Sequence, residues 1–309
     1  MLPQPLIRVT RSRSRQTTIK VELPNVSQNS QAIGLRVKPA VELNIAFLPE
    51  IRQFKPRDAS EDELKLMRLK QQKLREPHGQ IPAFLTGDDG SSSGDEQFLY
   101  KAVAATLVFG QETAGTAVCI SSSGLLLTCS HCVAESASDL DMSKAHWLLF
   151  ADGRIVKAKC VAWDERRDLA LLQVVATEDL TGLDIPTFPI AELAGSPPKR
   201  DLLLLCVGHP GSEDMEADRS GVLTDYDVLH LSRGRFRGLA KGQEVQNNSD
   251  IGALQHDCWT YWGHSGAPLL GEDGKLVGLH SSWDDETGMR RGVAWEAVKA
   301  FLAEHTVVG

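Results

Sequence analysis

Long hydrophobic runs are missing from this 309-residue sequence. The run LLLLCV at residues 202–207 is among the longest, well short of the roughly 18 apolar residues that a membrane-spanning helix needs. We therefore expect no membrane span. Hydrophobic residues still make up 42% of the chain, which is enough for a full-sized core in one large domain or two smaller ones.

Acidic side chains are missing from the first twenty residues, which carry five basic ones. This end also lacks the apolar core, about 7–15 residues long, of a secretory signal, so we expect an intracellular protein, cytoplasmic or nuclear. An Arg- and Ser-rich end fits a solvated arm, an organelle presequence, a nuclear address or a phosphorylatable tail. A further interpretation is that it tethers the chain to nucleic acid or to an anionic membrane.

Basic side chains are the minority from residue 98 on, because this part of the chain has 18 basic and 29 acidic residues. The whole chain has a net charge of −8. A surface of this sign repels nucleic-acid phosphates. We therefore expect no nucleic-acid partner for this part of the chain.

Cysteines are few and follow neither a disulfide nor a metal-binding pattern. They are scattered among apolar residues, as buried free thiols of a reducing compartment are: Cys119, Cys129, Cys132, Cys160, Cys206 and Cys258. The group Cys129-Ser130-His131-Cys132 could begin a zinc site, but no second cluster such as CxxC or HxxxH supplies the remaining ligands. We expect no metal and no cofactor.

The segment DDGSSSGDE at residues 88–96 is polar, acidic and rich in Gly and Ser, a composition typical of flexible linkers. It divides the chain into an N-terminal extension, residues 1–97 with the linker at 87–97, and a domain of residues 98–309. In the extension, Ser60 and Glu63 form a capping box and Pro77 follows a helical pattern, which predicts a helix over about 61–76. No fold is predicted for the rest of the extension.

Beyond the linker, short β-type runs alternate with Gly, Asp and Ser, which favours an all-β barrel or sandwich. The runs are YKAVAATLVFG (100–110), GTAVCISSSGLLLTCSH (115–131), RIVKAKCVAWD (154–164), DLALLQVV (168–175), DLLLLCVG (201–208), GVLTDYDVLHLSRG (221–234) and KLVGLHSSW (275–283). Only GVAWEAVKAFLAEH at residues 292–305 has helical spacing, so we expect a closing C-terminal helix.

Three fragments carry residues that need one another. Residues 261–268 read YWGHSGAP and place Ser265 between two glycines, either as a turn residue or as a nucleophile. A serine hydroxyl becomes a nucleophile only beside a general base that a carboxylate orients. The strand–turn–strand pattern of residues 115–133 puts His131 on the chain leaving a strand, at a barrel rim, and Asp168 opens another strand.

These fragments resemble the trypsin-like serine peptidases of the chymotrypsin fold, in the branch of HtrA-type and glutamyl-endopeptidase-type enzymes. GTAVCISSSGLLLTCSHCV, DLALLQV and GHSGAPL are similar to three motifs of that family and follow its order of His, Asp and Ser. The resemblance covers roughly residues 98–305. It implies a double β-barrel and the activity of a serine endopeptidase on protein or peptide substrates, while the oligomeric state is not predicted.

Carried over to this chain, the resemblance makes His131 the general base, Asp168 the residue that orients it, and Ser265 the nucleophile. The backbone N–H groups of Gly263 and Ser265 would form the oxyanion hole. Cys132 and Cys119 lie on opposing strands, but Cys119 takes the place of an aliphatic residue of the family, so we expect no disulfide. An alternative is a catalytically silent module of the same fold that binds extended peptides along a strand edge.

The resemblance also places the S1 specificity pocket, with Thr260 on one wall and the strand carrying His280 and Ser281 on another. Trp259 replaces the aspartate that selects basic P1 side chains, so we expect a polar pocket that prefers Glu or Gln at P1. In the other interpretation His280 is an ordinary strand histidine beside a small apolar pocket. We interpret His230, His256 and His264 as surface or turn residues. His209 is interpreted as a structural residue of a loop.

Overall fold

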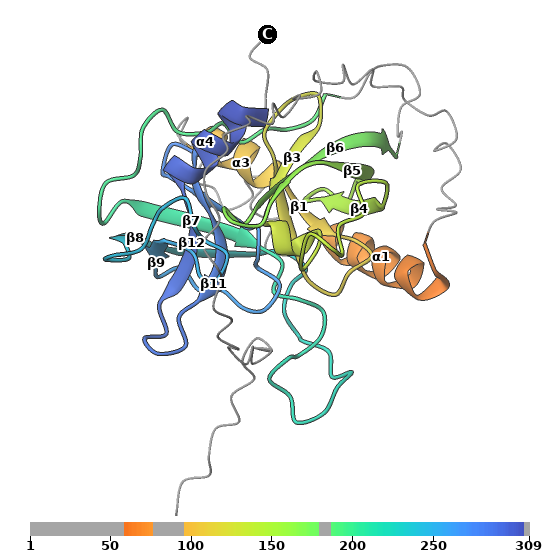
Figure 1. Cartoon of the computed structure of the whole chain (residues 1–309). Coiled ribbons are helices and arrows are strands. Elements are labelled where there is room, and N and C mark those ends of the chain that lie inside the picture. Colours follow the sequence, from red (N-terminus) through yellow and green to blue (C-terminus); the bar gives the residue numbers. More distant parts are fainter. Residues whose placement is uncertain (1–58, 77–95, 179–186, 306–309) are drawn as a thin grey trace, which may run out of the picture. The chain divides into compact units, whose positions relative to one another are not determined.

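The computed structural model describes residues 59–76, 96–178 and 187–305, all of which belong to one compact unit of the chain. They form two closed barrels of six antiparallel strands each (Figure 1). No helix among the described residues is long and apolar enough to cross a bilayer.

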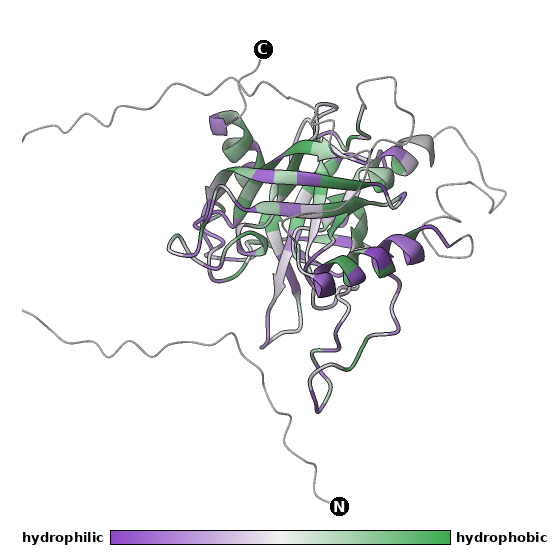
Figure 2. Cartoon of the chain, turned by 90° about the vertical axis from the view of Figure 1, so that its right-hand side faces the viewer, coloured by the Kyte–Doolittle hydropathy of each residue, from purple (hydrophilic) through white to green (hydrophobic). Residues whose placement is uncertain are grey.

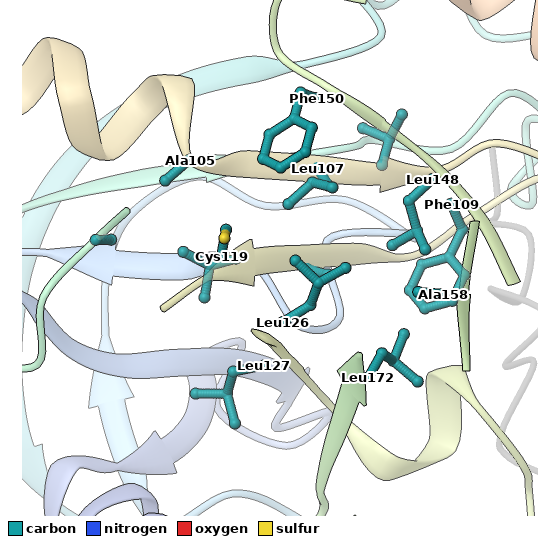
Figure 3. Packing of buried hydrophobic residues seen from close by; sticks show 14 of the residues in the cluster. Ala105, Leu107, Phe109, Cys119, Leu126, Leu127, Leu148, Phe150, Ala158 and Leu172 are labelled. Carbon is teal, nitrogen blue, oxygen red and sulfur yellow. The ribbon is translucent and has the colours of Figure 1, made fainter. Parts of the chain in front are cut away.

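The first barrel has the strand order β1-β2-β3-β6-β5-β4. Its strands are β1 (Thr106–Phe109), β2 (Thr116–Cys119), β3 (Leu125–Thr128), β4 (Ala145–Phe150), β5 (Ile155–Asp164) and β6 (Leu169–Thr177). Figure 3 shows how Leu107, Leu126, Leu148, Phe150 and Leu172 gather from different strands in its interior. These side chains are fully buried, so the barrel is a packed core rather than a channel.

The second barrel has the order β10-β11-β12-β9-β8-β7. Its strands are β7 (Leu203–Gly208), β8 (His230–Leu239), β9 (Leu254–His256), β10 (Pro268–Leu270), β11 (Leu276–Trp283) and β12 (Arg290–Ala294). Helix α4 (Trp295–His305) follows β12 and buries Phe301 in the larger of the two hydrophobic clusters. That cluster takes residues from both barrels, so the core is continuous between them.

The all-β architecture and the double barrel expected from the sequence are confirmed. One expected strand is partly wrong, because the run at 100–110 begins inside helix α3 (Glu96–Ala104) and only its end forms β1. Its Ala-rich start favours a helix. The C-terminal helix is confirmed, but Gly292–Ala294 belong to β12, which pairs with β11.

The helix expected at 61–76 is confirmed as α1 (Glu61–Leu74), with the Ser60–Glu63 capping box in place. Figure 2 shows α1 as largely hydrophilic with a few hydrophobic residues. Met67 and Leu74 of α1 are buried in the larger hydrophobic cluster. The boundary expected at 87–97 lies mostly outside the described residues and stays a prediction. Helix α1, which precedes this boundary in the sequence, packs against the first barrel.

We predict that a fragment of residues 98–309 folds but has a lower thermal midpoint than a fragment of residues 59–309. The longer fragment also buries Met67 and Leu74, and two such side chains stabilise by about 3–6 kcal/mol. This corresponds to a difference of at least about 6 °C for a domain of this size. Circular dichroism melting curves measure it. A 98–309 fragment that fails to fold would contradict the boundary, and equal midpoints would contradict a stabilising role for α1.

Candidate active site

Both barrels supply the residues singled out in the sequence. His131 lies in a short 3-10 turn, η2 (Ser130–Cys132), directly after β3, and Asp168 stands immediately before β6. Because β3 and β6 are paired, with Thr128 opposite Ala170, the two residues leave the first barrel at the same end. Ser265 lies in the loop that leads into β10 of the second barrel.

Asp168 is a buried carboxylate with four hydrogen bonds. Its Oδ1 atom accepts from His131 Nδ1 at 2.8 Å, from the His131 backbone N–H at 3.3 Å and from Ser130 Oγ at 3.0 Å. Its Oδ2 atom accepts from Ser281 Oγ at 2.6 Å. The backbone of Asp168 has a φ of 55°, in the left-handed region that Asp tolerates better than most residues. The sharp turn points the carboxylate at the donors.

Burial works against the charge on Asp168, but the nearby His131 and the hydrogen bonds from His131, Ser281 and Ser130 outweigh it and hold the pKa of the carboxyl below its ordinary value. The carboxyl is therefore ionised at neutral pH. A fixed negative charge at His131 Nδ1 selects the tautomer that carries its proton there, which leaves Nε2 free to accept a proton.

The Ser265 hydroxyl donates to the backbone carbonyl of Ser281 at 3.1 Å. No hydrogen bond joins it to His131 in the part of the chain that the structure describes. The backbone of Ser265 nevertheless lies against the histidine turn, because Cys132 Sγ donates to the Ser265 carbonyl at 3.4 Å. Hydrogen bonds of catalytic groups are often unformed in enzymes without substrate.

The loop around Ser265 offers two unused backbone donors. The N–H groups of Gly263 and Ser265 make no hydrogen bond to the described residues, whereas the neighbouring N–H groups of His264 and Gly266 donate to Tyr261 and His280 at 3.1 and 2.9 Å. Two free N–H groups near a serine hydroxyl are the kind of donors that an oxyanion hole requires.

Glycine is required on both sides of this arrangement. Gly263 has a φ of 100°, and a Cβ atom there would lie 2.6 Å from the His209 carbonyl oxygen. Gly266 has a φ of 83°, and its Cβ atom would lie 2.1 Å from the Thr116 carbonyl oxygen. Both conformations and both close approaches exclude other side chains.

The three residues expected at the S1 pocket behave differently from one another. The Ser281 hydroxyl donates its hydrogen bond to Asp168, so this side chain supports the carboxylate. His280 is buried on β11, and its Nδ1 atom lies 3.1 Å from His256 Nε2. The hydroxyl of Thr260 is buried and has no partner among the described residues.

Sequence reasoning missed a cluster of buried imidazoles. His256 and His264 are fully buried. Their interpretation as surface or turn histidines is wrong for His256, which lies in β9, whereas His264 does lie in a turn, its N–H donating to the Tyr261 carbonyl, but not at the surface. Their rings lie 5.2 and 6.3 Å from the ring of His280. Burial lowers the pKa of His256 and of His264 to about 3, and that of His280 well below its ordinary range. All three rings are therefore neutral, and buried neutral imidazoles act as hydrogen-bond donors or acceptors without charge.

Three potential metal ligands, on Cys129, His131 and Asp168, lie within 4.8 Å of one another. Burial and the neighbouring Asp168 charge raise the pKa of the Cys129 thiol well above its ordinary value, so it stays a thiol rather than the thiolate that binds metals. The Asp168 oxygens are already occupied by hydrogen bonds. This group is better suited to hold His131 than to bind a cation.

The thiols of Cys119 and Cys132 donate to different carbonyls, those of Ser121 and Ser265, and all six cysteines are free. Ser265 lies in the loop of residues 257–267 between β9 and β10, which we call the serine loop, and one exposed aromatic residue of this loop packs on a half-buried one. Trp262 is 37% exposed and meets Trp283, at the end of β11, edge to face with ring centroids 5.4 Å apart.

Curated relatives are serine proteases. The chain is 26% identical over 184 residues to the probable periplasmic serine endoprotease DegP-like of Pseudomonas fulva, a match that covers 60% of this chain and 32% of that protein. It is 29% identical over 186 residues to the serine protease Do-like HtrA of Bacillus subtilis, covering 58% and 35%. The chain thus spans about a third of the length of these relatives.

Among solved structures, the chain is similar to the serine endoprotease from Yersinia pestis, with a TM-score of 0.48 and 19% identity over 69% of this chain and 66% of that one. A family model described as a trypsin-like peptidase domain matches residues 115–279. The matched residues run from β2 into β11 and contain His131, Asp168 and Ser265. The chain belongs to the family of trypsin-like peptidase domains.

Proposed function

We propose that this chain is a serine endopeptidase in which His131, Asp168 and Ser265 act as a catalytic triad. The observation that carries the proposal is the 2.8 Å hydrogen bond between His131 and the buried Asp168 carboxylate, beside a serine loop with two unused N–H donors. The relatives, named serine proteases, support the same activity. The expected intracellular location gains no support from them, since the Pseudomonas fulva protein is named periplasmic.

The proposed reaction begins when the Ser265 side chain turns from the Ser281 carbonyl toward His131. Nε2 of His131 takes the hydroxyl proton while Oγ attacks the carbonyl carbon of the substrate, and Asp168 stabilises the imidazolium that forms. The N–H groups of Gly263 and Ser265 bind the oxyanion. His131 then gives its proton to the leaving amine, and the peptide bond breaks to leave an acyl-enzyme. Water, deprotonated by His131, releases the acyl product in the same way.

The alternative, a silent module that only binds extended peptides, is not favoured by the relatives. The two functions differ in one cheap measurement, because only an activated serine reacts with a fluorophosphonate probe. Labelling of Ser265, located by mass spectrometry of the labelled peptide, would exclude the silent module.

We predict that Ser265→Ala and His131→Ala each lower kcat/KM by about 10⁴-fold or more, because each removes a group that acts in the transition state. The matched control is Ser122→Ala, an exposed serine in the turn between β2 and β3, which we expect to leave activity unchanged. Peptide hydrolysis by the purified variants measures the effect. Near-parental rates in either triad variant would remove the assignment.

We predict that activity falls as the pH is lowered from about 8 to 5, since only a neutral imidazole accepts the serine proton and histidines titrate in this range. Asp168 does not set this limit, because its lowered pKa keeps it ionised until the pH falls below the ordinary carboxyl range. A pH profile of kcat/KM measures this fall in activity. A flat profile over this interval would argue against a histidine base.

The pocket is proposed to prefer Glu or Gln at P1. Trp259 offers no countercharge to a basic side chain, while the Thr260 hydroxyl is a buried group without a partner. If His256 Nε2 donates to His280 Nδ1, the Nε2 atom of His280 carries a proton and is a donor for a side-chain oxygen of the substrate.

For this pocket we predict that a peptide library is cleaved after Glu or Gln roughly ten- to a hundredfold faster than after apolar residues, because a polar group left unpaired on burial is costly. His280→Ala should abolish the preference. His230→Ala is the control, since His230 is half-buried and meets Trp259 edge to face with ring centroids 4.6 Å apart, without being one of the expected pocket residues. Dominant cleavage after Arg, Lys or large aromatic residues would refute the preference.

A further inference from the structure

Lys70, in the third turn of α1, is almost completely buried, with 1% of its surface exposed. Lysine is rarely buried to this extent unless its charge is paired. Here the side-chain amino group has two backbone partners, because Nζ donates to the carbonyl of Phe109 at 2.8 Å and to that of Glu112 at 2.6 Å. A lysine held in this way joins α1 to a defined stretch of backbone.

The two carbonyls lie where the chain leaves β1. We call residues 109–116, the connection from β1 to β2 together with the last residue of β1 and the first of β2, the β1–β2 loop. The same loop is fixed by the side chain of Gln111. Its Nε2 donates to Glu63 of α1 at 3.3 Å, and its Oε1 accepts from the Trp147 backbone N–H at 2.9 Å. The first half of the loop is therefore held between α1 and β4.

The other end of the β1–β2 loop holds the serine loop. Gly115 N donates to the carbonyl of Gly263 at 3.1 Å, and Thr116 N donates to the carbonyl of Ser265 at 2.9 Å. The Thr116 hydroxyl adds a second donor to the Gly263 carbonyl at 3.2 Å. Both residues whose N–H groups are unused thus have their carbonyl groups fixed by two neighbouring residues of this loop. Each carbonyl lies in the peptide plane that follows its residue, so these bonds hold the backbone on the C-terminal side of Gly263 and of Ser265 in place.

We infer that Lys70 is a positioning residue, which orients the N–H groups of Gly263 and Ser265 through the β1–β2 loop. The inference rests on the proposed function, because only there do these N–H groups bind an oxyanion. It assigns part of the active-site geometry to a helix that lies outside the two barrels. A methionine at position 70 would fill the space but leave both carbonyls without their donor.

The neighbouring Gln71 provides a matched control on the same helix. Its side-chain amide also attaches α1 to the first barrel, but it donates to the Gly153 carbonyl at 2.9 Å and to Glu178 at 3.0 Å. Neither partner belongs to the β1–β2 loop. Gln71→Met therefore weakens the docking of α1 without removing a donor from that loop.

The experiment compares Lys70→Met and Gln71→Met in the full chain, by steady-state kinetics and by hydrogen–deuterium exchange of peptides covering 109–116 and 262–266. We expect Lys70→Met to lower kcat at least about tenfold, with KM changed less than about threefold, since losing an oxyanion donor typically costs 10²–10³-fold. Exchange in 262–266 should become faster. Gln71→Met should change kcat less than about twofold and leave this exchange unchanged.

Equal losses in the two variants, or unchanged exchange in 262–266 for Lys70→Met, would overturn the inference and leave α1 a purely structural element. If Lys70→Met does not fold, Lys70→Gln, which keeps a donor at a shorter reach, replaces it, and the same comparison decides. If the parent protein neither hydrolyses peptides nor reacts with a fluorophosphonate, the proposed function fails. The exchange data alone then decide whether Lys70 controls the serine loop.

Discussion

The carboxylate of Asp168 is the one group on which the arrangement of the site depends. Its Oδ1 atom holds the histidine turn of the first barrel, and its Oδ2 atom holds Ser281 on β11 of the second. The carbonyl of Ser281 in turn receives the Ser265 hydroxyl. A buried charge is tolerated only when it is fully hydrogen-bonded, and this requirement brings Asp168 and Ser281 together although they lie 113 positions apart in the sequence.

Much of the fold and part of the candidate site could be predicted from the sequence. His131 and Asp168 stand next to apolar strands, so the ends of β3 and β6 could be placed, and a capping box marked the start of α1. Short elements could not be placed in the same way. β9 and β10 have three residues each, too few for a periodic pattern, and they form only because neighbouring strands pair with them.

The contacts of polar side chains were the part that the sequence did not reveal. Ser281 was expected on a pocket wall but donates to Asp168, because a pattern shows where a residue stands but not which atom it contacts. His256 and His264 were misjudged for the same reason. Both rings lie against His280 of β11, a contact between distant parts of the sequence that no local run of residues indicates.

The contact between Asp168 and Ser281 also has a consequence for the order in which the protein is made. Ribosomes synthesise a chain from its N-terminus, so the segment containing His131 and Asp168 emerges well before Ser265, and Ser281 emerges later still. A growing chain that ends before residue 281 has no donor for Oδ2 of Asp168 and no carbonyl to receive the Ser265 hydroxyl. The candidate site is therefore assembled only once Ser281 and the strand β11 that carries it have been synthesised.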